Sequence, residues 1–569
     1  MKNKVLFTKY AKNMDKSCPH AYYPRPQMQR ESYLCLNGEW DYGTSCARDE
    51  INLDRRITVP FPPQSALSGI DEHIDLGCYM HYSRRVVLLD GFVGDRLILH
   101  FGAIDQEAWV YVNGKYIGER LGGYIPFEFD ITDAILGNEI EIRVTVRDSY
   151  DLKYPYGKQT EKRGGMWYTP ISGIWQSVWL ESVPENCIKS LRFTPIDGGV
   201  RLEVTGGCNE KTVEVEGLGT YKTNGGAVDI IPDSPRLWSP ESPNLYYATV
   251  SDGVDTVRTY FAIRWIDVRN VDGKERICLN GEPYVFNGLL DQGYFPDGLF
   301  LPATEDGYLD DIRLARSLGY NMLRKHIKIE PDIFYYLCDR EGIAVFQDMV
   351  NNSAYSFLRD TALPTVGLQK LSDKNAHKNS ESRAIFEKTM LETIELLYNH
   401  PSVVYYTVFN EGWGQFRADD MYEIAKRADP TRIVDATSGW FRRKESDVDS
   451  RHIYFKALKP KSLSGKPLVI SEFGGYSYRE EGHLFVDDNY GYRLFKTQKE
   501  FEDAVTSLYG NEVLPLIKDG ACAFVYTQVS DVEDETNGLI TYDREVVKVN
   551  TEKFSSVIGG CSGKLTDIF

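Results

Sequence analysis

Between residues 267 and 569, short apolar runs alternate with stretches of helical periodicity, and this rhythm constrains the fold more than any other feature. The runs that read as strands are YVFNGLL (284–290), NMLRKHI (321–327), IAVFQDM (343–349), VVYYTVFN (403–410), RIVDAT (432–437), HIYF (452–455), PLVISEF (467–473) and CAFVYTQ (522–528). Helical patterns lie at 305–318, 331–341, 381–398 and 419–428, and the region 488–519 supplies a late loop and helix. Buried strands alternating with helices predict a parallel sheet closed into a (β/α)8 barrel.

The sequence before residue 267 has a different rhythm, in which short β-rich runs are separated by turn residues. Runs such as DRLILHFG and EIEIRVTV, between about residues 34 and 181, predict an all-β sandwich. Within VYVNGKYIG, the pair Asn113-Gly114 separates two alternating runs and predicts a hairpin. A second Gly-rich β region has the size of an immunoglobulin-like sandwich. We therefore expect three domains, at 1–183, 184–266 and 267–569.

Composition excludes several classes of function. The chain carries 65 basic and 83 acidic residues, a net charge of −18, and an acidic surface repels phosphate backbones, so we expect no nucleic-acid partner. No apolar run is long enough to cross a bilayer, and the N-terminus lacks the pattern of a secretory signal. We therefore expect a cytoplasmic protein with no membrane partner. Ten cysteines without a CxxC pair indicate neither a disulfide framework nor a zinc knuckle.

Two glutamates stand at the ends of expected barrel strands. Glu411 ends the fourth strand, before Gly412-Trp413-Gly414, and Glu472 ends the seventh, before Gly-Gly. The carboxyl ends of barrel strands meet at one rim, where barrel enzymes carry out their chemistry. A single glutamate there is more often a helix cap or an ion-pair partner. Two such carboxyls at one rim instead match the pair that glycoside hydrolysis needs, one as proton donor and one as nucleophile.

Longer motifs surround these glutamates. The chain resembles the family 2 glycoside hydrolases, the group that contains β-galactosidases, β-glucuronidases and β-mannosidases. The resemblance rests on LNGEWDYG, VYVNGKYIGERLGGYIPFEFDIT, YPYGKQ and SGIWQSVWLE in the first region and on NMLRKHIKIEPDIFYYLCDREGIAVFQDM, NHPSVVYYTVFNEGWGQF and KPLVISEFGG in the barrel. It implies that the first domain is a jelly-roll sugar-binding domain. It also implies that Glu411 is the acid/base, Glu472 the nucleophile and Asn410 a donor to the sugar 2-hydroxyl.

Other candidate substrate-binding residues have structural alternatives. Arg324 and His326 fall where the family commonly has Arg and His near the sugar, although an ion-pair role is an equal alternative. Tyr454 could hydrogen-bond the nucleophile or simply pack beside its strand. Asp291, with its neighbour Gln292, could bind a hydroxyl or organise its loop. Trp413 is expected to pack near Glu411 or to wall the aglycone side of the pocket, the alternative being a tryptophan between barrel and helix.

The chain also departs from the family pattern. Gln347-Asp348 stands where well-known members have Asp-Glu, and Tyr526-Thr527-Gln528 stands where they often have Trp, so Tyr526 and Gln528 are candidates for an altered sugar pocket. The Glu-x-His that holds magnesium in large β-galactosidases does not follow Asp348, so we expect no required metal and no cofactor. We also find no convincing Asn-x-Lys of the kind β-glucuronidases use for the uronate carboxylate.

These features together predict a retaining exo-β-glycosidase that acts on a carbohydrate or glycoside and is most similar to the β-galactosidases. A β-glucuronidase is the alternative enzyme, and a non-catalytic sugar-binding protein is the alternative outside enzymes. Retention requires the two carboxyl groups to lie about 5 to 5.5 Å apart. The sugar, the aglycone and the oligomeric state stay open, a homo-oligomer included.

Overall fold

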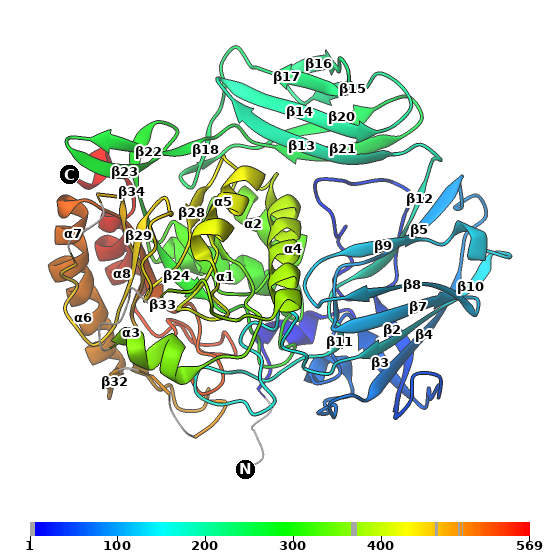
Figure 1. Cartoon of the computed structure of the whole chain (residues 1–569), viewed down its shortest axis with the longest axis horizontal. Helices are drawn as coiled ribbons and strands as arrows, with labels where there is room; N and C mark the ends of the chain where they lie inside the picture. Colours follow the sequence, from blue (N-terminus) through cyan, green and yellow to red (C-terminus); the bar gives the residue numbers. More distant parts are fainter. Residues whose placement is uncertain (1–5, 366–371, 461–464, 488–489, 492) are drawn as a thin grey trace.

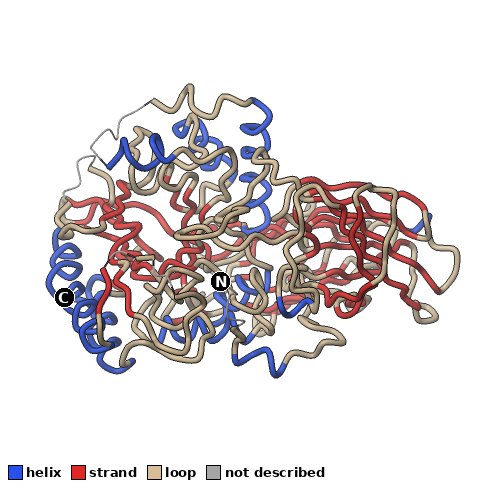
Figure 2. The backbone as a smooth tube through the Cα atoms, turned by 90° about the horizontal axis from the view of Figure 1, so that it is seen from below, coloured by secondary structure: helices blue, strands red, loops and turns tan. Residues whose placement is uncertain are grey.

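The computed structural model describes residues 6–365, 372–460, 465–487, 490–491 and 493–569. The chain forms a jelly-roll β-sandwich, an immunoglobulin-like β-sandwich and a (β/α)8 barrel, and both sandwiches lie against the barrel (Figure 1). Figure 2 shows the helices gathered around the barrel and strands dominating the jelly-roll end of the molecule. The fold class expected from the sequence is confirmed.

The jelly-roll sandwich packs a four-stranded sheet, β1-β12-β5-β9, against a six-stranded sheet, β3-β2-β4-β10-β7-β8. Its strands are β1 (Tyr33–Cys35), β2 (Gly38–Ser45), β3 (Arg55–Val59), β4 (Tyr79–Val87), β5 (Arg96–Phe101), β6 (Ile104–Asp105), β7 (Glu107–Val112), β8 (Lys115–Leu121), β9 (Phe127–Asp130), β10 (Glu139–Arg147), β11 (Gly173–Ile174) and β12 (Val178–Val183). The β7–β8 hairpin turns at Asn113 and Gly114, whose φ angles are 50° and 77°, so the hairpin expected from this pair is confirmed.

The immunoglobulin-like sandwich packs β13-β14-β17 against β16-β15-β20-β21. Its strands are β13 (Ile188–Ile196), β14 (Gly199–Gly206), β15 (Thr212–Val215), β16 (Gly219–Lys222), β17 (Ala227–Ile230), β18 (Trp238–Ser239), β19 (Ser242–Pro243), β20 (Tyr246–Ser251) and β21 (Thr256–Phe261). Alternating burial along β14 and β15 places every second side chain in the core between the sheets.

The barrel sheet runs in the order β28-β27-β26-β25-β24-β33-β30-β29, and all neighbours are parallel. Its strands are β24 (Glu282–Asp291), β25 (Met322–Lys325), β26 (Ala344–Asp348), β27 (Val403–Thr407), β28 (Ile433–Asp435), β29 (Asp449–Ile453), β30 (Leu468–Gly474) and β33 (Ala521–Thr527). The hairpin of β22 (Ile266–Val271) and β23 (Lys274–Leu279) pairs with the N-terminal end of β24, as does β34 (Gly563–Lys564). Elsewhere, β31 (Tyr476–Tyr478) pairs with β32 (Arg493–Phe495). Asp447, two residues before β29, donates its backbone N–H to Val434 O on β28 at 2.9 Å, so the barrel is nearly closed.

Helices cover the outside of the barrel, as the sequence predicted. They are α1 (Asp306–Ser317), α2 (Asp332–Glu341), α3 (Leu363–Thr365), α4 (Ser380–Leu397), α5 (Ala418–Ala428), α6 (Gln498–Leu508), α7 (Leu514–Asp519), α8 (Thr551–Ile558) and α9 (Leu565–Ile568). Residues 488, 489 and 492 of the expected late loop lie outside the described residues. Several strands end earlier than expected: β27 ends at Thr407 rather than at residue 410, β28 ends at Asp435 rather than at residue 437, and β29 ends at Ile453. Phe455 has a φ of 59° and is 80% exposed, which is incompatible with continuing the strand.

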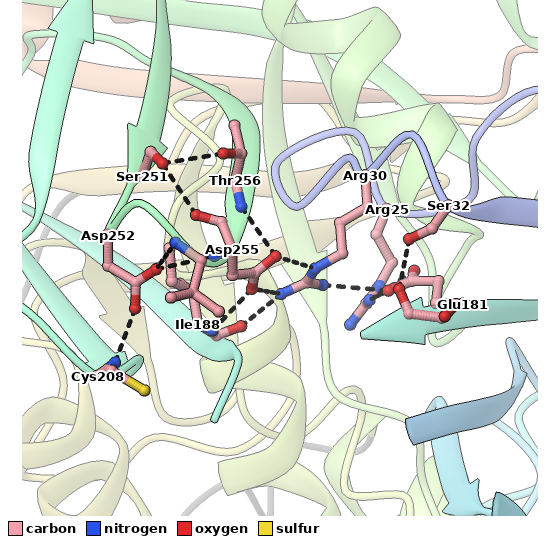
Figure 3. A network of polar contacts seen from close by, with 12 residues as sticks. Arg25, Arg30, Ser32, Glu181, Ile188, Cys208, Ser251, Asp252, Asp255 and Thr256 are labelled. Atoms are coloured by element: carbon pink, nitrogen blue, oxygen red, sulfur yellow. Dashed lines mark hydrogen bonds and ion pairs between the residues drawn. The ribbon is translucent and has the colours of Figure 1, made fainter. Parts of the chain in front are cut away.

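A buried polar network fastens an N-terminal segment to both sandwiches (Figure 3). The Arg30 guanidinium donates to Glu181 on β12 at 3.1 Å and to Asp255 of the immunoglobulin-like sandwich at 2.9 and 3.2 Å. Arg25 adds a donor to Glu181 at 2.6 Å. Although burial opposes ionisation, these cations hold the pKa of Glu181 at about 2. Every charge in this network therefore has a partner within the chain.

A second buried cluster joins the immunoglobulin-like sandwich to the barrel. Tyr260 donates to Asp339 at 2.8 Å, and His400 lies between Asp339 and Asp332, with N–O distances of 2.6 and 2.5 Å. Burial alone would lower the pKa of His400, but the two carboxylates raise it to about 10. His400 is therefore protonated at neutral pH.

Two further features bear on the expectations from composition. All ten cysteines are free thiols. Among the described residues, no helix combines the length and the apolar character needed to span a bilayer.

Candidate active site

Glu411 lies at the rim of the barrel because the chain turns sharply after β27. Its φ is 50°, and its amide donates to Ser438 O at 2.9 Å, which fixes it beside the segment that follows β28. Gly412 and Gly414 follow with φ values of 83° and 64°, as expected for a turn that releases the strand. A Cβ at Gly412 would lie 2.3 Å from the Phe441 ring, so the turn also requires glycine for close packing.

Glu472 is presented by an irregularity in β30. Against β29, Arg451 pairs with Ile470 and His452 pairs with Glu472, so Ser471 is left without a partner. The pairing with β33 is interrupted at the same place. Bulges of this kind re-aim side chains next to active sites, and here the result directs Glu472 toward the residues that follow β27 and β29.

The two carboxyl groups face each other across His452. Nδ1 of His452 lies 2.7 Å from Glu411 Oε1 and 3.4 Å from Glu472 Oε2. One oxygen of each glutamate and this nitrogen all lie within 4.8 Å of one another. Because Arg324 can only donate, at 3.4 Å, to Nε2 of His452, Nδ1 carries the imidazole proton. Burial lowers the pKa of His452 to about 4, so the ring is neutral.

The environments of the two glutamates differ. Burial raises the pKa of Glu411 and of Glu472. Glu472 accepts from the Arg324 guanidinium at 3.1 Å and from the Tyr454 hydroxyl at 2.7 Å, and both donors favour its ionised form. Glu411 has neutral His452 at 2.7 Å, and the Trp440 side chain also lowers its pKa, but no guanidinium or ammonium lies within 4.0 Å of it in the described part of the chain. This difference favours Glu411 over Glu472 as the protonated member of the pair.

Arg324 is the hub of the site. It is 1% exposed and donates to Asp348 at 2.9 Å and to Asn410 Oδ1 at 2.9 Å, besides its bond to Glu472. These contacts match the ion-pair role, one of the two roles that the sequence left open for Arg324. Because Arg324 occupies Oδ1 of Asn410, the amide NH2 of Asn410 remains as the group available to a ligand.

His326 is held by Asp348, whose carboxylate lies 2.8 Å from its Nδ1. Burial, Lys158 and Arg324 lower the pKa of His326 to about 3, although Asp348 opposes this shift. The neutral ring donates from Nδ1, so Nε2 is left as an acceptor. His326 can therefore accept a bond from a sugar hydroxyl.

Three other candidates are held by the chain itself. Asp291 pairs with the Lys325 ammonium at 2.6 Å and accepts from Gly293 N at 2.9 Å, which is the loop-organising alternative. Tyr454 donates to Glu472, as already described, and its hydroxyl lies 2.9 Å from Thr527 Oγ1. Oε1 of Gln528 accepts from the Gln292 amide at 2.9 Å, and the NH2 group of Gln528 donates to Asn537 at 2.8 Å. Both ends of the Gln528 amide therefore support the rim.

Tyr526 does not lie in the sugar pocket for which the sequence made it a candidate. Its side chain is fully buried in the core between barrel and helices, with ring centroids 5.7 Å from Phe473 and 6.5 Å from Tyr509. Side chains alternate between the two faces of a strand, and Thr527, not Tyr526, reaches the rim. The sequence motif identified the strand end but not its facing residue.

Trp413 packs against the jelly-roll domain. Its ring stacks on Trp167 with centroids 5.0 Å apart, and Tyr355 meets it edge-on at 5.3 Å. The indole is only 2% exposed, whereas Trp167 and Tyr355 are partly exposed. Trp413 thus supports an aromatic wall that those two residues present to solvent.

Sequence reasoning missed three groups at this site. His452 shares a strand face with Tyr454 two residues later, and this spacing could have identified it. Lys158 and Trp167 come from the jelly-roll domain, and no local pattern predicts that their loop reaches the barrel. Glu411, His452 and Glu472 also present donor atoms close enough for one cation, although the bonds above already use these atoms.

A (β/α)8 barrel with two facing carboxyl groups at its strand ends is an architecture of glycoside hydrolases. The chain belongs to glycosyl hydrolases family 2. The family's sugar binding domain matches residues 58–184, its TIM barrel domain matches residues 271–546, and a further model of the family matches residues 194–264.

Curated relatives carry two different activities in their names. The chain is 25% identical over 440 residues to a β-galactosidase of Leuconostoc mesenteroides and 24% identical over 462 residues to a β-glucuronidase of Bacteroides fragilis. These matches cover 70% and 72% of this chain but only 39% and 61% of the two relatives. The chain therefore spans about half the length of the curated relatives it matches.

Solved structures share the fold over nearly the whole chain. A β-glucuronidase of Faecalibacterium prausnitzii gives a TM-score of 0.71 at 20% identity and covers 94% of this chain and 98% of its own. A β-galacturonidase of Eisenbergiella tayi gives a TM-score of 0.71 at 19% identity, with coverages of 95% and 100%. At this identity the likeness concerns the fold alone.

Proposed function

We propose that the protein is a retaining exo-β-glycosidase in which Glu472 is the nucleophile and Glu411 the acid/base. The observation that carries the proposal is the pair of carboxyl oxygens within 4.8 Å of each other at the barrel rim. Retaining enzymes hold their carboxyl groups about 5 to 5.5 Å apart, whereas inverting enzymes need roughly 6.5 to 9.5 Å for an intervening water.

The contacts of each glutamate suit its step. Arg324 and Tyr454 keep Glu472 ionised and aim it at the anomeric carbon, while Glu411, whose pKa is raised by burial, gives its proton to the leaving oxygen. The glycosyl ester removes the negative charge of Glu472, so the pKa of Glu411 falls. Glu411 then takes a proton from the water that attacks the ester, and the His452 N–H stabilises the resulting carboxylate.

Neighbouring groups fit the sugar as well as the reaction. The free amide of Asn410 can donate to the 2-hydroxyl, and Nε2 of His326 can accept from another hydroxyl. The partly exposed rings of Trp167 and Tyr355 offer apolar faces to an aglycone. These contacts need no metal and no organic cofactor.

The sequence favours a β-galactoside as substrate, and a β-uronide is the second candidate. The ammonium of buried Lys158, which has no carboxylate within 4.0 Å in the described part of the chain, favours the uronide. A panel of nitrophenyl β-glycosides, including galactoside, glucoside, mannoside, glucuronide and galacturonide, tests the proposal. We expect turnover of at least one substrate that is lost in Glu472→Ala. Turnover of none, by an enzyme that is folded, would contradict the proposal.

A further inference from the structure

A loop of the jelly-roll domain is fixed against the mouth of the barrel. Tyr156 donates its amide to Asn351 O at 3.1 Å, and Gln159 accepts from Ile171 N at 2.7 Å. Between them, Gly157 has a φ of 65°, and a Cβ there would lie 2.9 Å from the carbonyl oxygen of Ile327, next to the end of β25. The backbone that carries Lys158 is therefore held within reach of His326, which precedes Ile327.

Lys158 extends from this loop between two aromatic rings. Its ammonium lies 5.4 Å from the centroid of Tyr168 and 6.0 Å from that of Trp413. Trp413 follows Glu411 by two residues, and the Tyr168 hydroxyl bonds to Glu535. Burial raises the pKa of Glu411 and of Glu535, and the positive charge of Lys158 lowers it; for His326, burial and Lys158 both lower the pKa.

The ammonium of Lys158 has no carboxylate partner. The residue is 7% exposed, yet in the described part of the chain no ion pair within 4.0 Å and no hydrogen bond involves its side chain. Three other buried cations near the rim are each paired with a carboxylate, at 3.1 Å or closer: Arg324 with Asp348 and Glu472, Lys325 with Asp291 and Glu330, and Lys328 with Glu330. Lys158 differs from them in this respect.

The neighbouring carboxyls form no ion pair with Lys158 within 4.0 Å in the described part of the chain. Burial raises the pKa of both Glu411 and Glu535, so both favour the neutral form more than an exposed carboxyl does. An ammonium removed from water without an ionised partner is unfavourable, and a carboxylate that enters the cleft would supply that partner. A sugar hydroxyl would satisfy the hydrogen bond but not the charge.

We infer that Lys158 binds the carboxylate of a uronic acid residue in the substrate, so that the jelly-roll domain supplies the group that selects a uronide over a neutral glycoside. This inference rests on the proposed function, because the sugar it concerns is the one on which Glu411 and Glu472 act. It assigns to the YPYGKQ loop the role for which the sequence offered no Asn-x-Lys element in the barrel.

Matched substrates and variants test the inference. The substrates are nitrophenyl β-glucuronide against β-glucoside and β-galacturonide against β-galactoside, since each pair differs only at C6. Lys158→Met keeps the aliphatic stem and removes the charge, and Lys162→Met is the control because Lys162 is exposed on the same loop. For Lys158→Met we expect kcat/KM on the preferred uronide to fall roughly 100-fold or more, since it breaks a largely desolvated charge pair. On its neutral partner the loss should be clearly smaller, because Lys158 has no carboxylate to bind there, and any effect through the pKa of Glu411 is common to both substrates of a pair. Lys162→Met should leave the ratio of the two kcat/KM values unchanged.

Several results would overturn the inference. Equal losses on both members of a pair would make Lys158 a general electrostatic or structural group, and a wild-type preference for neutral substrates would exclude a uronide site. If Lys158→Met fails to fold, Lys158→Gln takes its place, and its kcat/KM on the uronide is compared with that on the neutral partner in the same way. Should wild type cleave none of the substrates, the proposed function fails, and calorimetry with glucuronate and galacturonate decides the inference separately. Binding that is lost in Lys158→Met supports it, whereas binding that is absent or independent of Lys158 contradicts it.

Discussion

The interface around Arg30 and the mouth of the barrel both bury charged groups, but they use them differently. At the interface, the guanidinium of Arg30 meets Glu181 and Asp255, and Arg25 also pairs with Glu181, so each of these four groups has a counter-charge (Figure 3). At the mouth, Glu411 has no cationic partner within 4.0 Å among the described residues other than His452, which is neutral, and Lys158 has none. Charged groups that are paired within the chain hold the domains together, whereas groups at the mouth without such a partner are available to bind a substrate. Each prediction below perturbs one side of this comparison.

Glu472→Ala should have the largest effect. Without the nucleophile no glycosyl ester forms, so turnover should fall roughly 10⁴- to 10⁶-fold with every leaving group, as for other deleted nucleophiles. Steady-state kinetics on aryl and alkyl glycosides measures this loss. The melting temperature should change much less than in a variant of the Arg30 network, because Arg324 keeps Asp348 as a carboxylate partner. A variant that keeps turnover on either class would remove Glu472 from the nucleophile role.

Glu411→Ala should separate leaving groups. General acid catalysis contributes roughly 10²- to 10⁴-fold, and alkyl glycosides should lose this factor in kcat/KM because their leaving oxygens need a proton. Activated aryl glycosides need little protonation, so their kcat/KM should change much less. Comparing the two substrate classes in one preparation gives the answer. Equal losses would take the acid role away from Glu411.

Arg30→Met should lower stability and leave catalysis unchanged, the opposite of the two active-site variants. Two buried carboxylates would lose their shared cation, and breaking such a network costs about 3 to 5 kcal/mol of unfolding free energy. Urea unfolding measures the loss, while kcat of the folded fraction should stay near the wild-type value. Arg201→Met is the matched control, because its pair with Asp229 is exposed. A comparable loss in both variants would show that burial of the pair is not what matters.

The cluster around His400 should make stability depend on pH. Its pKa is about 10 in the folded protein against roughly 6.5 in an unfolded chain, so the folded state binds this proton more tightly. The stabilisation is complete below about pH 6.5 and is lost as the pH rises through about 10. The difference in melting temperature between wild type and His400→Gln should shrink across that window. A difference that stays constant would mean that His400 is neutral in the folded protein.

The sequence predicts the barrel strands and the two carboxyl groups of the site better than it predicts the residues around them. Glu411 and Glu472 could be found because Glu411 follows β27 and Glu472 lies near the end of β30, and the ends of barrel strands converge by topology. Tyr526 was misplaced because motif position does not tell which face of a strand a residue occupies. Lys158 could not be placed at all, since its position depends on a jelly-roll loop packing against Ile327, a contact between segments far apart in the chain.

The stereochemistry of the first product tests the central claim most directly. Two successive displacements at the anomeric carbon, first by Glu472 and then by water, restore the configuration of the substrate. Proton NMR of the hydrolysis of a β-glycoside that the enzyme accepts, followed from the first minutes, reports the anomer before it equilibrates. The account predicts that the β-anomer accumulates first and that the α-anomer appears only by mutarotation. Initial release of the α-anomer would contradict the assignment of Glu411 and Glu472 as a retaining pair.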